Sequence, residues 1–310
     1  MKPLVSILIP CYNNQDFVGE AIESALNQTY SNIEVIVVND GSTDNSLHVI
    51  KGFGDRIKWI DAKNQGACAA RNAALKMCQG EFVQFLDADD TIDHRKIEKQ
   101  LPILLGDLAD ISFCQADYFN ECGPLISDHP GYPPPTGDHL EYMLSYGFGT
   151  ALPLHKKCRL VSVSGFRENL SRAQETDLHL RLVSRGARIH VMPDRLMHIR
   201  LHDGPRISAK KSPADHMLKI LLNTYFENKD SIETNAQRRN CMARYILKNS
   251  IYAFRGNKEA EALVGFNVSK KLKYSRLHPC GGIALKCIAM LIGVYESEIL
   301  RKKIGLSLRK

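Results

Sequence analysis

The N-terminal third of the chain alternates continuously apolar runs with segments of helical periodicity. Apolar runs of strand length cover residues 4–10, 33–40, 57–62 and 81–88, and apolar side chains at helical spacing fill residues 16–28 and 66–78. Strands that are apolar along their whole length are buried on both faces, so they form a mainly parallel sheet covered by helices. The sequence therefore predicts an α/β fold, in which ligands bind beyond the carboxyl ends of the strands.

Carboxylates gather at the end of the fourth apolar run. The stretch "FVQFLDADDTID" ends a buried strand in Asp87, Asp89 and Asp90. Like charges this close repel one another, so the cluster predicts a bound cation. Hard oxygen ligands suit Mg²⁺ or Mn²⁺. The alternative is that all three carboxylates cap a following helix.

Polar residues also follow the first and second apolar runs, at 10–14 and 39–42. Three loops therefore converge on one rim of the sheet. A dinucleotide site requires G-x-G-x-x-G after the first strand, and this sequence has neither that motif nor a P-loop. These absences argue against a hydride-transfer enzyme and a nucleoside triphosphatase.

The formal charge of +7 is unevenly distributed along the chain. Residues 1–120 hold 10 Lys and Arg against 17 Asp and Glu, and residues 121–310 hold 31 against 17. Such a basic half faces nucleic acid, anionic lipid or a phosphorylated substrate, or is a solvated surface. The opening "MKPLVSILIP" has too short an apolar stretch for a signal peptide, which predicts a cytoplasmic location.

Four ordered blocks carry a family resemblance. They are "VSILIPCYNN", "SALNQTYSNIEVIVVNDGSTDNS", "NQGACAARNAAL" and "GEFVQFLDADD". In order and spacing they resemble the nucleotide-binding half of the family 2 inverting glycosyltransferases, which adopt the GT-A fold. The resemblance covers residues 3–110 and continues more weakly to 208. It implies a nucleotide-sugar donor and a glycan or lipid-linked glycan acceptor in cell-surface glycan synthesis, with no nucleic acid partner.

The resemblance also implies a domain plan. Residues 1–208 form the catalytic domain, divided into a nucleotide-sugar-binding half (1–110) and an acceptor half (111–208). Residues 209–310 lie outside the resemblance, and their helical pattern predicts a C-terminal extension packed on the catalytic domain. Within it, residues 281–310 are predicted to form an amphipathic helix that lies on an anionic membrane surface, docks on the protein's own core or binds a partner protein.

The donor site follows from the same resemblance. The residues that it places on the nucleotide or its diphosphate are Pro10, Tyr12, Asn14, Asp40, Arg71, Asp87, Ala88 and Arg200. Asp40 is placed to accept a hydrogen bond from the imide N–H of uracil, which favours UDP, although a guanine would also satisfy it. Asp87 is placed on the ribose. The alternatives are a ligand-free turn for the first loop and an exposed salt bridge for Arg71.

The resemblance also implies that Asp89 and His202 bind a Mn²⁺ or Mg²⁺ ion. His202 belongs to "HIRLHDGPRIS", which resembles an element that closes over the donor. Asp90 is predicted to cap the following helix or to support the metal ligands.

The acceptor half contains "VSGFRENLSRAQETDLHLRLVSRG", residues 163–186, which resembles the family segment around the general base. It departs twice, with Arg167 where an acid is common and Gln174-Glu175 where Glu-Asp is usual. The alignment makes Glu175 the general base and Asp177 its rival. Alternatively, Glu175 is only a carboxylate favoured by the helix dipole. The departures leave open a catalytically silent nucleotide-sugar-binding protein, and the architecture leaves open a sugar nucleotidyltransferase.

Overall fold

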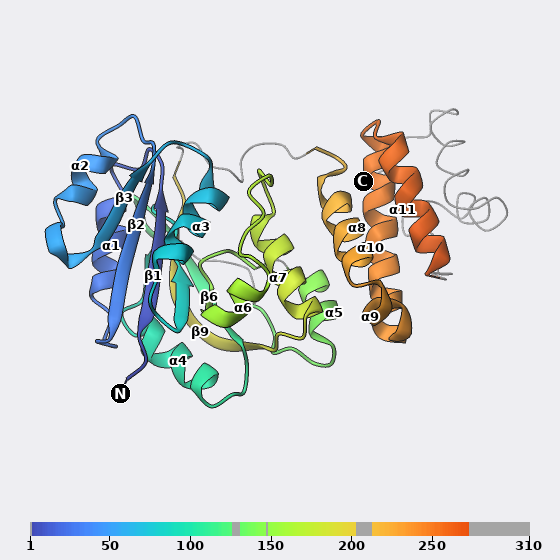
Figure 1. Cartoon of the computed structure of the whole chain (residues 1–310), viewed down its shortest axis with the longest axis horizontal. Coiled ribbons are helices and arrows are strands. Elements are labelled where there is room, and N and C mark those ends of the chain that lie inside the picture. The colour runs from blue at the N-terminus through green and yellow to red at the C-terminus, as the bar shows by residue number, and fades with distance from the viewer. Residues whose placement is uncertain (1, 126–130, 147, 203–212, 273–310) are drawn as a thin grey trace. The chain divides into compact units, whose positions relative to one another are not determined.

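The structure is a computed structural model of the chain, and it describes residues 2–125, 131–146, 148–202 and 213–272. The chain divides into two compact units, Met1–Ala209 and Lys210–Lys310 (Figure 1). Every residue that the sequence assigns to the candidate site belongs to the first unit.

A parallel sheet forms the first half of the first unit. Its strands lie in the order β3 (Lys58–Ala62), β2 (Ile33–Asp40), β1 (Val5–Cys11) and β4 (Phe82–Phe85). All three neighbouring pairs are parallel. The crossover helices are α1 (Val18–Leu26), α2 (Ser46–Lys51) and α3 (Ala67–Met77), with the 3₁₀ turn η1 (Gly54–Arg56) before β3.

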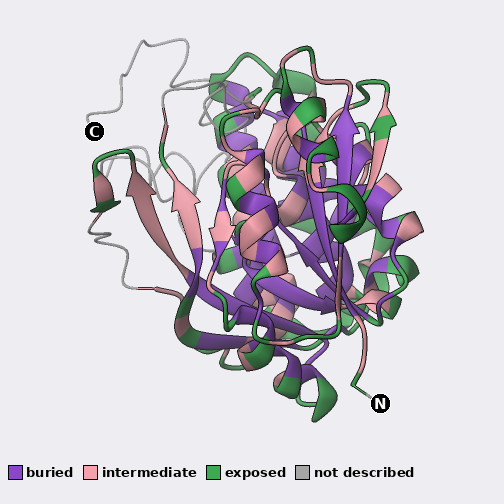
Figure 2. Cartoon of the chain, turned by 90° about the vertical axis from the view of Figure 1, so that its left-hand side faces the viewer, coloured by how far each residue is buried: buried purple, intermediate pink, exposed green. Residues whose placement is uncertain are grey.

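Helices α1 and α3 pack on opposite faces of this sheet, and both contact β1 and β2. The connections β1–α1–β2 and β3–α3–β4 run in opposite directions across the sheet, so right-handed crossovers place their helices on opposite faces. Figure 2 shows the strands buried between helices whose outer faces are exposed. The predicted α/β fold, with a parallel sheet in its N-terminal half, is confirmed.

The sheet continues beyond β4 as β8, β6, β9 and β5. The elements of this half are β5 (Thr91–Ile92), α4 (Lys96–Leu105), β6 (Ile111–Asn120), β7 (Gly123–Leu125), α5 (His139–Ser145), β8 (Pro153–Lys156), α6 (Lys157–Ser162), α7 (Gln174–Ser184) and β9 (Ile189–Arg200). Strand β8 runs antiparallel to β4, so the sheet changes from parallel to mixed at this pair. The long strand β9 returns to the Asp87–Asp90 loop through its antiparallel partner β5.

The segment after the carboxylate cluster differs from the prediction. Strand β5 follows Asp90 directly, and α4 begins only at Lys96. The prediction that Asp90 caps the following helix is therefore wrong. Asp90 is buried, and its Oδ1 accepts a hydrogen bond from the backbone N–H of Arg200 at 2.9 Å. This bond ties the end of β9 to the carboxylate loop.

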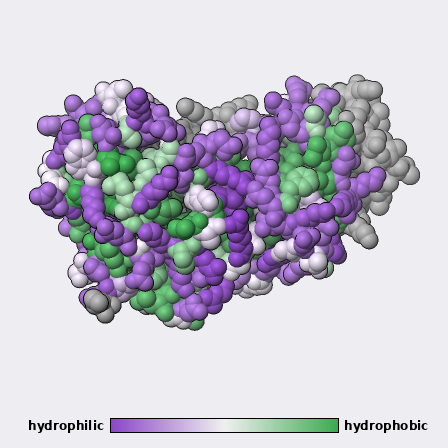
Figure 3. All heavy atoms as spheres, in the orientation of Figure 1, coloured by the Kyte–Doolittle hydropathy of each residue, from purple (hydrophilic) through white to green (hydrophobic). Residues whose placement is uncertain are grey.

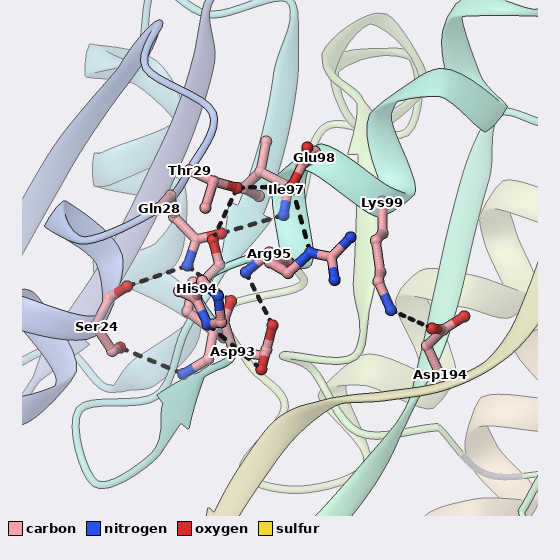
Figure 4. Close-up of polar contacts among 11 residues, drawn as sticks. Ser24, Gln28, Thr29, Asp93, His94, Arg95, Ile97, Glu98, Lys99 and Asp194 are labelled. Carbon is pink, nitrogen blue, oxygen red and sulfur yellow. Dashed lines mark hydrogen bonds and ion pairs between the residues drawn. The ribbon is translucent and has the colours of Figure 1, made fainter.

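A buried glutamine joins α1 to the connection between β5 and α4 (Figure 4). The Nε2 of Gln28 donates to the backbone oxygens of Ser24 at 3.1 Å and Asp93 at 2.9 Å. Its Oε1 accepts from the N–H of Ile97 at 3.1 Å. One side-chain amide thus satisfies backbone groups of three segments, which fixes where α4 begins.

The described part of the second unit is helical. Its helices are α8 (His216–Glu227), α9 (Lys229–Thr234), α10 (Ala236–Arg255) and α11 (Glu259–Lys271). Helices α10 and α11 approach closely at Gly265, where a Cβ atom would lie 2.0 Å from the Ser250 Oγ. Hydrophobic residues gather on one face of this unit (Figure 3).

None of the helices in the described ranges is long and apolar enough to cross a bilayer. The amphipathic helix predicted for residues 281–310 lies outside the described residues.

Candidate active site

The loops after β1 and β2 are joined by side-chain hydrogen bonds. The N–H of Asn14 donates to the Ser46 Oγ at 2.9 Å, and the N–H of Asn13 donates to the Ser42 Oγ at 3.0 Å. Tyr12 is 47% exposed at this rim. Pro10 lies in strand β1, opposite Val38, so it is not part of a turn. The joined loops form a fixed surface with an exposed aromatic ring, as binding a flat base requires.

Asp40 ends β2 and is almost fully buried. Its Oδ1 accepts from the N–H of Gln65 at 2.8 Å and its Oδ2 from the N–H of Gly66 at 2.9 Å, at the start of α3. Gly41 has a φ of +67°, and a Cβ atom there would lie 2.7 Å from the backbone nitrogen of Asn64. Because an ionised carboxylate accepts about four hydrogen bonds, Asp40 retains lone pairs for a base N–H.

Arg71 of α3 connects two parts of the site. Its NH2 group donates to Asp87 Oδ1 at 2.7 Å, and its NH1 group donates to Gln174 Oε1 at 2.7 Å. The guanidinium lies over the ring of Phe166, 5.3 Å from its centroid. The side chain of Arg71 is only 6% exposed, which excludes the alternative of an exposed salt bridge.

Asp89 and His202 meet across 113 positions of sequence. The Nε2 of His202 lies 3.2 Å from the Oδ2 of Asp89, and the imidazole packs on the ring of Phe17 at a centroid distance of 4.9 Å. The structure thus brings together the two residues predicted as metal ligands. Ala88 between the two aspartates is 2% exposed, so any donor contact there would come from its backbone.

Arg200, at the end of β9, is held next to the same loop. Its NH2 group forms an ion pair with Glu20, and its Nε donates to the backbone oxygen of Asp89 at 3.2 Å. Its guanidinium lies between the rings of Phe17 and Phe119, at 4.9 and 4.5 Å from their centroids. Its predicted phosphate contact would therefore compete with Glu20 for the guanidinium.

Glu175 and Asp177, the two predicted bases, occupy different environments in the first turn of α7. Burial raises the pKa of Glu175; Arg71 and Arg172 oppose this rise, and the charge of Asp87 adds to it. Asp177 is fully buried, with Oδ2 2.8 Å from the Nε of Arg181 and Oδ1 3.1 Å from NH1 of Arg167. Both oxygens of Asp177 face guanidinium groups and neither is exposed to a substrate, so the geometry favours Glu175.

Three contributing residues were not predicted from the sequence. Phe17 supports both His202 and Arg200, Glu20 pairs with Arg200, and Gln174 binds Arg71. Phe17 and Glu20 carried no signal, since they fit an ordinary amphipathic helix. Gln174 did carry one, because it stands where the related segment has an acid.

A sequence profile of the family described as "Glycosyl transferase family 2" matches residues 6–169. The chain belongs to this family. The family 2 match contains the loops after β1, β2 and β4, and it ends before α7, so Glu175 lies beyond it.

Among similar sequences, an uncharacterised glycosyltransferase of Haemophilus influenzae is 45% identical over 107 residues, which cover 33% of this chain and 43% of that protein. A chondroitin synthase of Escherichia coli is 31% identical over 214 residues, covering 67% of this chain and 30% of the synthase. The matched segments therefore span less than half the length of either relative.

Two solved structures share the fold of this family 2 chain. TarS 1–349 of S. aureus, in complex with UDP-GlcNAc, has a TM-score of 0.62 at 17% identity, covering 89% of this chain and 93% of that one. A mannosyltransferase of Pyrobaculum calidifontis, in complex with GDP-Man and Mn²⁺, has a TM-score of 0.59 at 15% identity, covering 99% and 89%. At these identities the likeness establishes the GT-A fold.

The pair of Asp89 and His202 fits a divalent cation. A carboxylate oxygen and an imidazole nitrogen are both ligands of Mn²⁺, and their 3.2 Å separation allows both to bind one ion. Within the described ranges no third His, Cys, Asp or Glu joins them to form a larger metal-binding cluster. A cation here would need further oxygen ligands from a bound substrate or water.

Proposed function

We propose that the chain is an inverting glycosyltransferase that moves a hexosyl or N-acetylhexosaminyl group from a UDP-sugar to an acceptor hydroxyl. The observation that carries the proposal is the link made by Arg71. This residue joins the Asp87 loop, on the donor side, to the start of the helix that bears Glu175. A proposed donor site and a half-buried carboxylate with a raised pKa are thereby held together, as direct transfer between two bound substrates requires.

The donor would lie across the rim formed by the loops after β1, β2 and β4. Tyr12 and Asn14 would contact the base, with Pro10 beneath them, and Asp40 would accept from its imide N–H. Asp87 would bind the ribose, and the backbone of Ala88 would follow the sugar. Arg71 and Arg200 would approach the diphosphate, where guanidinium groups form charge-assisted hydrogen bonds with phosphate oxygens.

Asp89 and His202 would hold Mn²⁺ or Mg²⁺ together with the diphosphate. The cation would neutralise the charge that develops on the leaving nucleoside diphosphate. The neighbouring Asp90 would support this loop through its hydrogen bond to the backbone of Arg200.

Transfer would be a single displacement. Glu175 takes the proton from the acceptor hydroxyl while that oxygen attacks the anomeric carbon. The bond from this carbon to the diphosphate breaks on the opposite face, and the nucleoside diphosphate leaves with the bonding electron pair. The configuration at the anomeric carbon is therefore inverted.

The acceptor is proposed to be a glycan or a lipid-linked glycan in cell-surface polysaccharide synthesis. The similarity to a chondroitin synthase over 67% of this chain supports a polysaccharide acceptor. Residues 1–208 would be the catalytic domain, working at the cytoplasmic face of the membrane, and residues 209–310 would contribute a basic surface.

A panel of UDP- and GDP-sugars tests the proposal. A correct donor with Mn²⁺ should raise the melting temperature, because a ligand at about 100 times its Kd adds about 2.7 kcal/mol to the free energy of unfolding. Transfer should then release nucleoside diphosphate. Pyrophosphate release would instead identify a sugar nucleotidyltransferase, and binding without turnover would identify a catalytically silent binding protein.

A further inference from the structure

Gln174 is the first residue of α7 and uses both ends of its side-chain amide. Its Oε1 accepts from Arg71 at 2.7 Å, and its Nε2 donates to the backbone oxygen of Leu170 at 3.0 Å. The residue is 7% exposed. The guanidinium of Arg71 needs a hydrogen-bond acceptor, and the carbonyl oxygen of Leu170 needs a donor. The side chain at position 174 must therefore provide both. Glutamine provides both, whereas a carboxylate provides only acceptors.

These contacts determine where α7 begins. Its N-cap residue, Ala173, has a φ of +48° and no side chain that can cap the helix. The first turn of a helix leaves backbone N–H groups unsatisfied, and a helix start without a cap is less well fixed. The amide of Gln174 anchors this turn to α3 through Arg71 and to the preceding segment through Leu170. Glu175 is the next residue, so its position depends on the same anchor.

Arg71 extends the connection to the donor side, because its second nitrogen binds Asp87 at 2.7 Å. One guanidinium thus joins the proposed ribose-binding carboxylate to the start of α7. Such a guanidinium has a fixed planar geometry, so a displacement of either partner is transmitted to the other. The chain of contacts is Gln174, Arg71, Asp87.

Charge gives a second reason for a neutral residue at this position. Several charged or titratable groups interact electrostatically with Glu175. They are Arg71 and Cys68 of α3, Asp87 of the loop after β4, and Arg172 before α7. Asp87 adds negative charge near Glu175, and Arg71, which pairs with Asp87, offsets it; Asp177, in the same turn of α7, is paired with Arg181 and Arg167. A carboxylate at position 174 would compete with Asp87 for Arg71 and would repel the carboxylate of Glu175.

We propose that Gln174 is a positioning residue, whose neutral amide couples the helix that bears the general base to the donor-binding loop through Arg71. The proposal rests on the proposed function for the role of Glu175, but the coupling itself can be measured without turnover. It also accounts for the departure of this sequence from the family segment. In this sequence the residue before the proposed glutamate base is uncharged.

The decisive experiment is a carboxyl ¹³C NMR titration of the full chain labelled at glutamate. The Glu175 resonance is identified by its loss in Glu175→Gln. In Gln174→Glu the titration midpoint of Glu175 should rise by about one pH unit, as expected for an added like charge at close range. The resonance of the new glutamate is identified by its presence in the double variant Gln174→Glu/Glu175→Gln.

Gln28→Glu is the matched control. Gln28 is equally buried, and its amide also joins carbonyl oxygens to an N–H donor, at α1. The control should lower the melting temperature while leaving the Glu175 midpoint unchanged. An unchanged midpoint in Gln174→Glu, or an equal rise in Gln28→Glu, would overturn the proposal. Because the titration needs no substrate, a protein inactive with every donor would disprove the proposed function without affecting this result.

Gln174→Met provides a second test, and it decides the matter if Gln174→Glu fails to fold. Methionine keeps the length of the side chain but cannot bind Arg71. UDP affinity in the presence of Mn²⁺ should fall about tenfold, the effect of losing roughly one hydrogen bond to a charged group. Adding Gln174→Met to Asp87→Asn should weaken binding no further, because both act through Arg71. Unchanged UDP affinity in Gln174→Met, or additive losses in the double variant, would contradict the coupling.

Discussion

At the scale of single residues, Asp89 is the clearest test of the cation site. Its carboxylate meets His202 at 3.2 Å. Asp89→Ala should therefore abolish Mn²⁺-dependent stabilisation by UDP and abolish transfer, while the melting temperature without ligand changes little, since Asp89 is partly exposed. Asp107→Asn, at an exposed carboxylate, is the control. Full activity in excess EDTA would refute the metal assignment.

Turnover separates the two candidate bases. Glu175→Gln keeps the shape of the side chain and removes its ability to accept a proton, so transfer should fall by roughly a hundred- to ten-thousandfold while donor binding persists. Asp177→Asn should instead destabilise the fold by about 3–5 kcal/mol, because it removes the buried carboxylate that pairs with the buried Arg181 and with Arg167. If Asp177→Asn folds normally and alone loses transfer, Asp177 is the base.

Glu175→Gln should also alter stability with pH. The pKa of Glu175 is raised in the folded protein above its value of 4.5 in the unfolded chain. Below pH 4.5 the carboxyl is protonated in both states and its desolvation does not affect stability. As pH rises through the pKa of the folded protein, ionisation of the desolvated carboxyl destabilises the fold. The variant should melt at a higher temperature than wild type at pH 8, and the difference should vanish near pH 4. Glu98→Gln, at an exposed position, should show no such difference. A variant less stable than wild type at pH 8 would show that Glu175 is not strained by burial.

A sequence pattern can indicate a candidate site when the chemistry of the site limits which residue types can form it. The carboxylates at 87 and 89 indicated a cation site because repulsion demands a counter-charge. In the fold Asp87 pairs with Arg71 and Asp89 lies next to His202, and metal binding there stays a prediction. The link through Gln174 could not be predicted, since it depends on the fold bringing Arg71 of α3 to Gln174 of α7, 103 positions apart in sequence. Helix capping by Asp90 was wrong for the same reason, because its partner is the backbone of Arg200; the alternative, support of the metal ligands, stays a prediction.

At the scale of elements, the strands and helices of the parallel half follow from sequence periodicity, because each is locally determined by apolar spacing. The mixed half does not. Strand β8 has only four residues, and β5 has two, so both exist through pairing with distant strands rather than through their own pattern. Short strands of this kind depend on tertiary contacts that periodicity does not encode.

A buried histidine pair joins two of these elements. His155 of β8 and His179 of α7 lie parallel with their Nε2 atoms 3.4 Å apart, and both are fully buried. Burial lowers the pKa of His155 to about 3 and that of His179 well below its ordinary value. The unfolded chain takes up protons near pH 6.5 whereas the folded chain does not, so the fold loses stability as pH falls below 6.5.

His179→Leu tests this pair. Between about pH 6 and pH 4 the free energy of unfolding should fall less steeply in the variant than in wild type. The difference in slope should be about 1.4 kcal/mol per pH unit, the contribution of one proton. Denaturant titrations at a series of pH values measure the slope. His94→Leu, at a side chain that is 62% exposed, is the control and should leave the slope as in wild type. An unchanged slope in His179→Leu would show that the pair is protonated in the folded protein.

At the scale of the whole molecule, charge divides with the two units. Residues 1–209 contain 21 Lys and Arg against 26 Asp and Glu, whereas residues 210–310 contain 20 against 8, a net charge of +12. The net positive charge of the chain therefore comes entirely from the second unit, since the first has a net charge of −5. Lys and Arg near an anionic bilayer each contribute about 1 kcal/mol of attraction, within a Debye length of about 10 Å at 0.1 M salt.

We therefore expect the full chain to float with vesicles containing anionic lipid at low salt and to be released at about 0.5 M salt, where the attraction is screened. Residues 1–209 alone, with a net charge of −5, should remain in the soluble fraction. Deleting residues 282–310 removes six of the twenty basic residues and two acidic ones, so flotation should weaken. Loss of all binding on this deletion, with the melting temperature preserved, would place the contact in that segment rather than in the helices α8 to α11. Flotation of residues 1–209, or a full chain that stays soluble at low salt, would contradict the assignment of the second unit to the membrane surface.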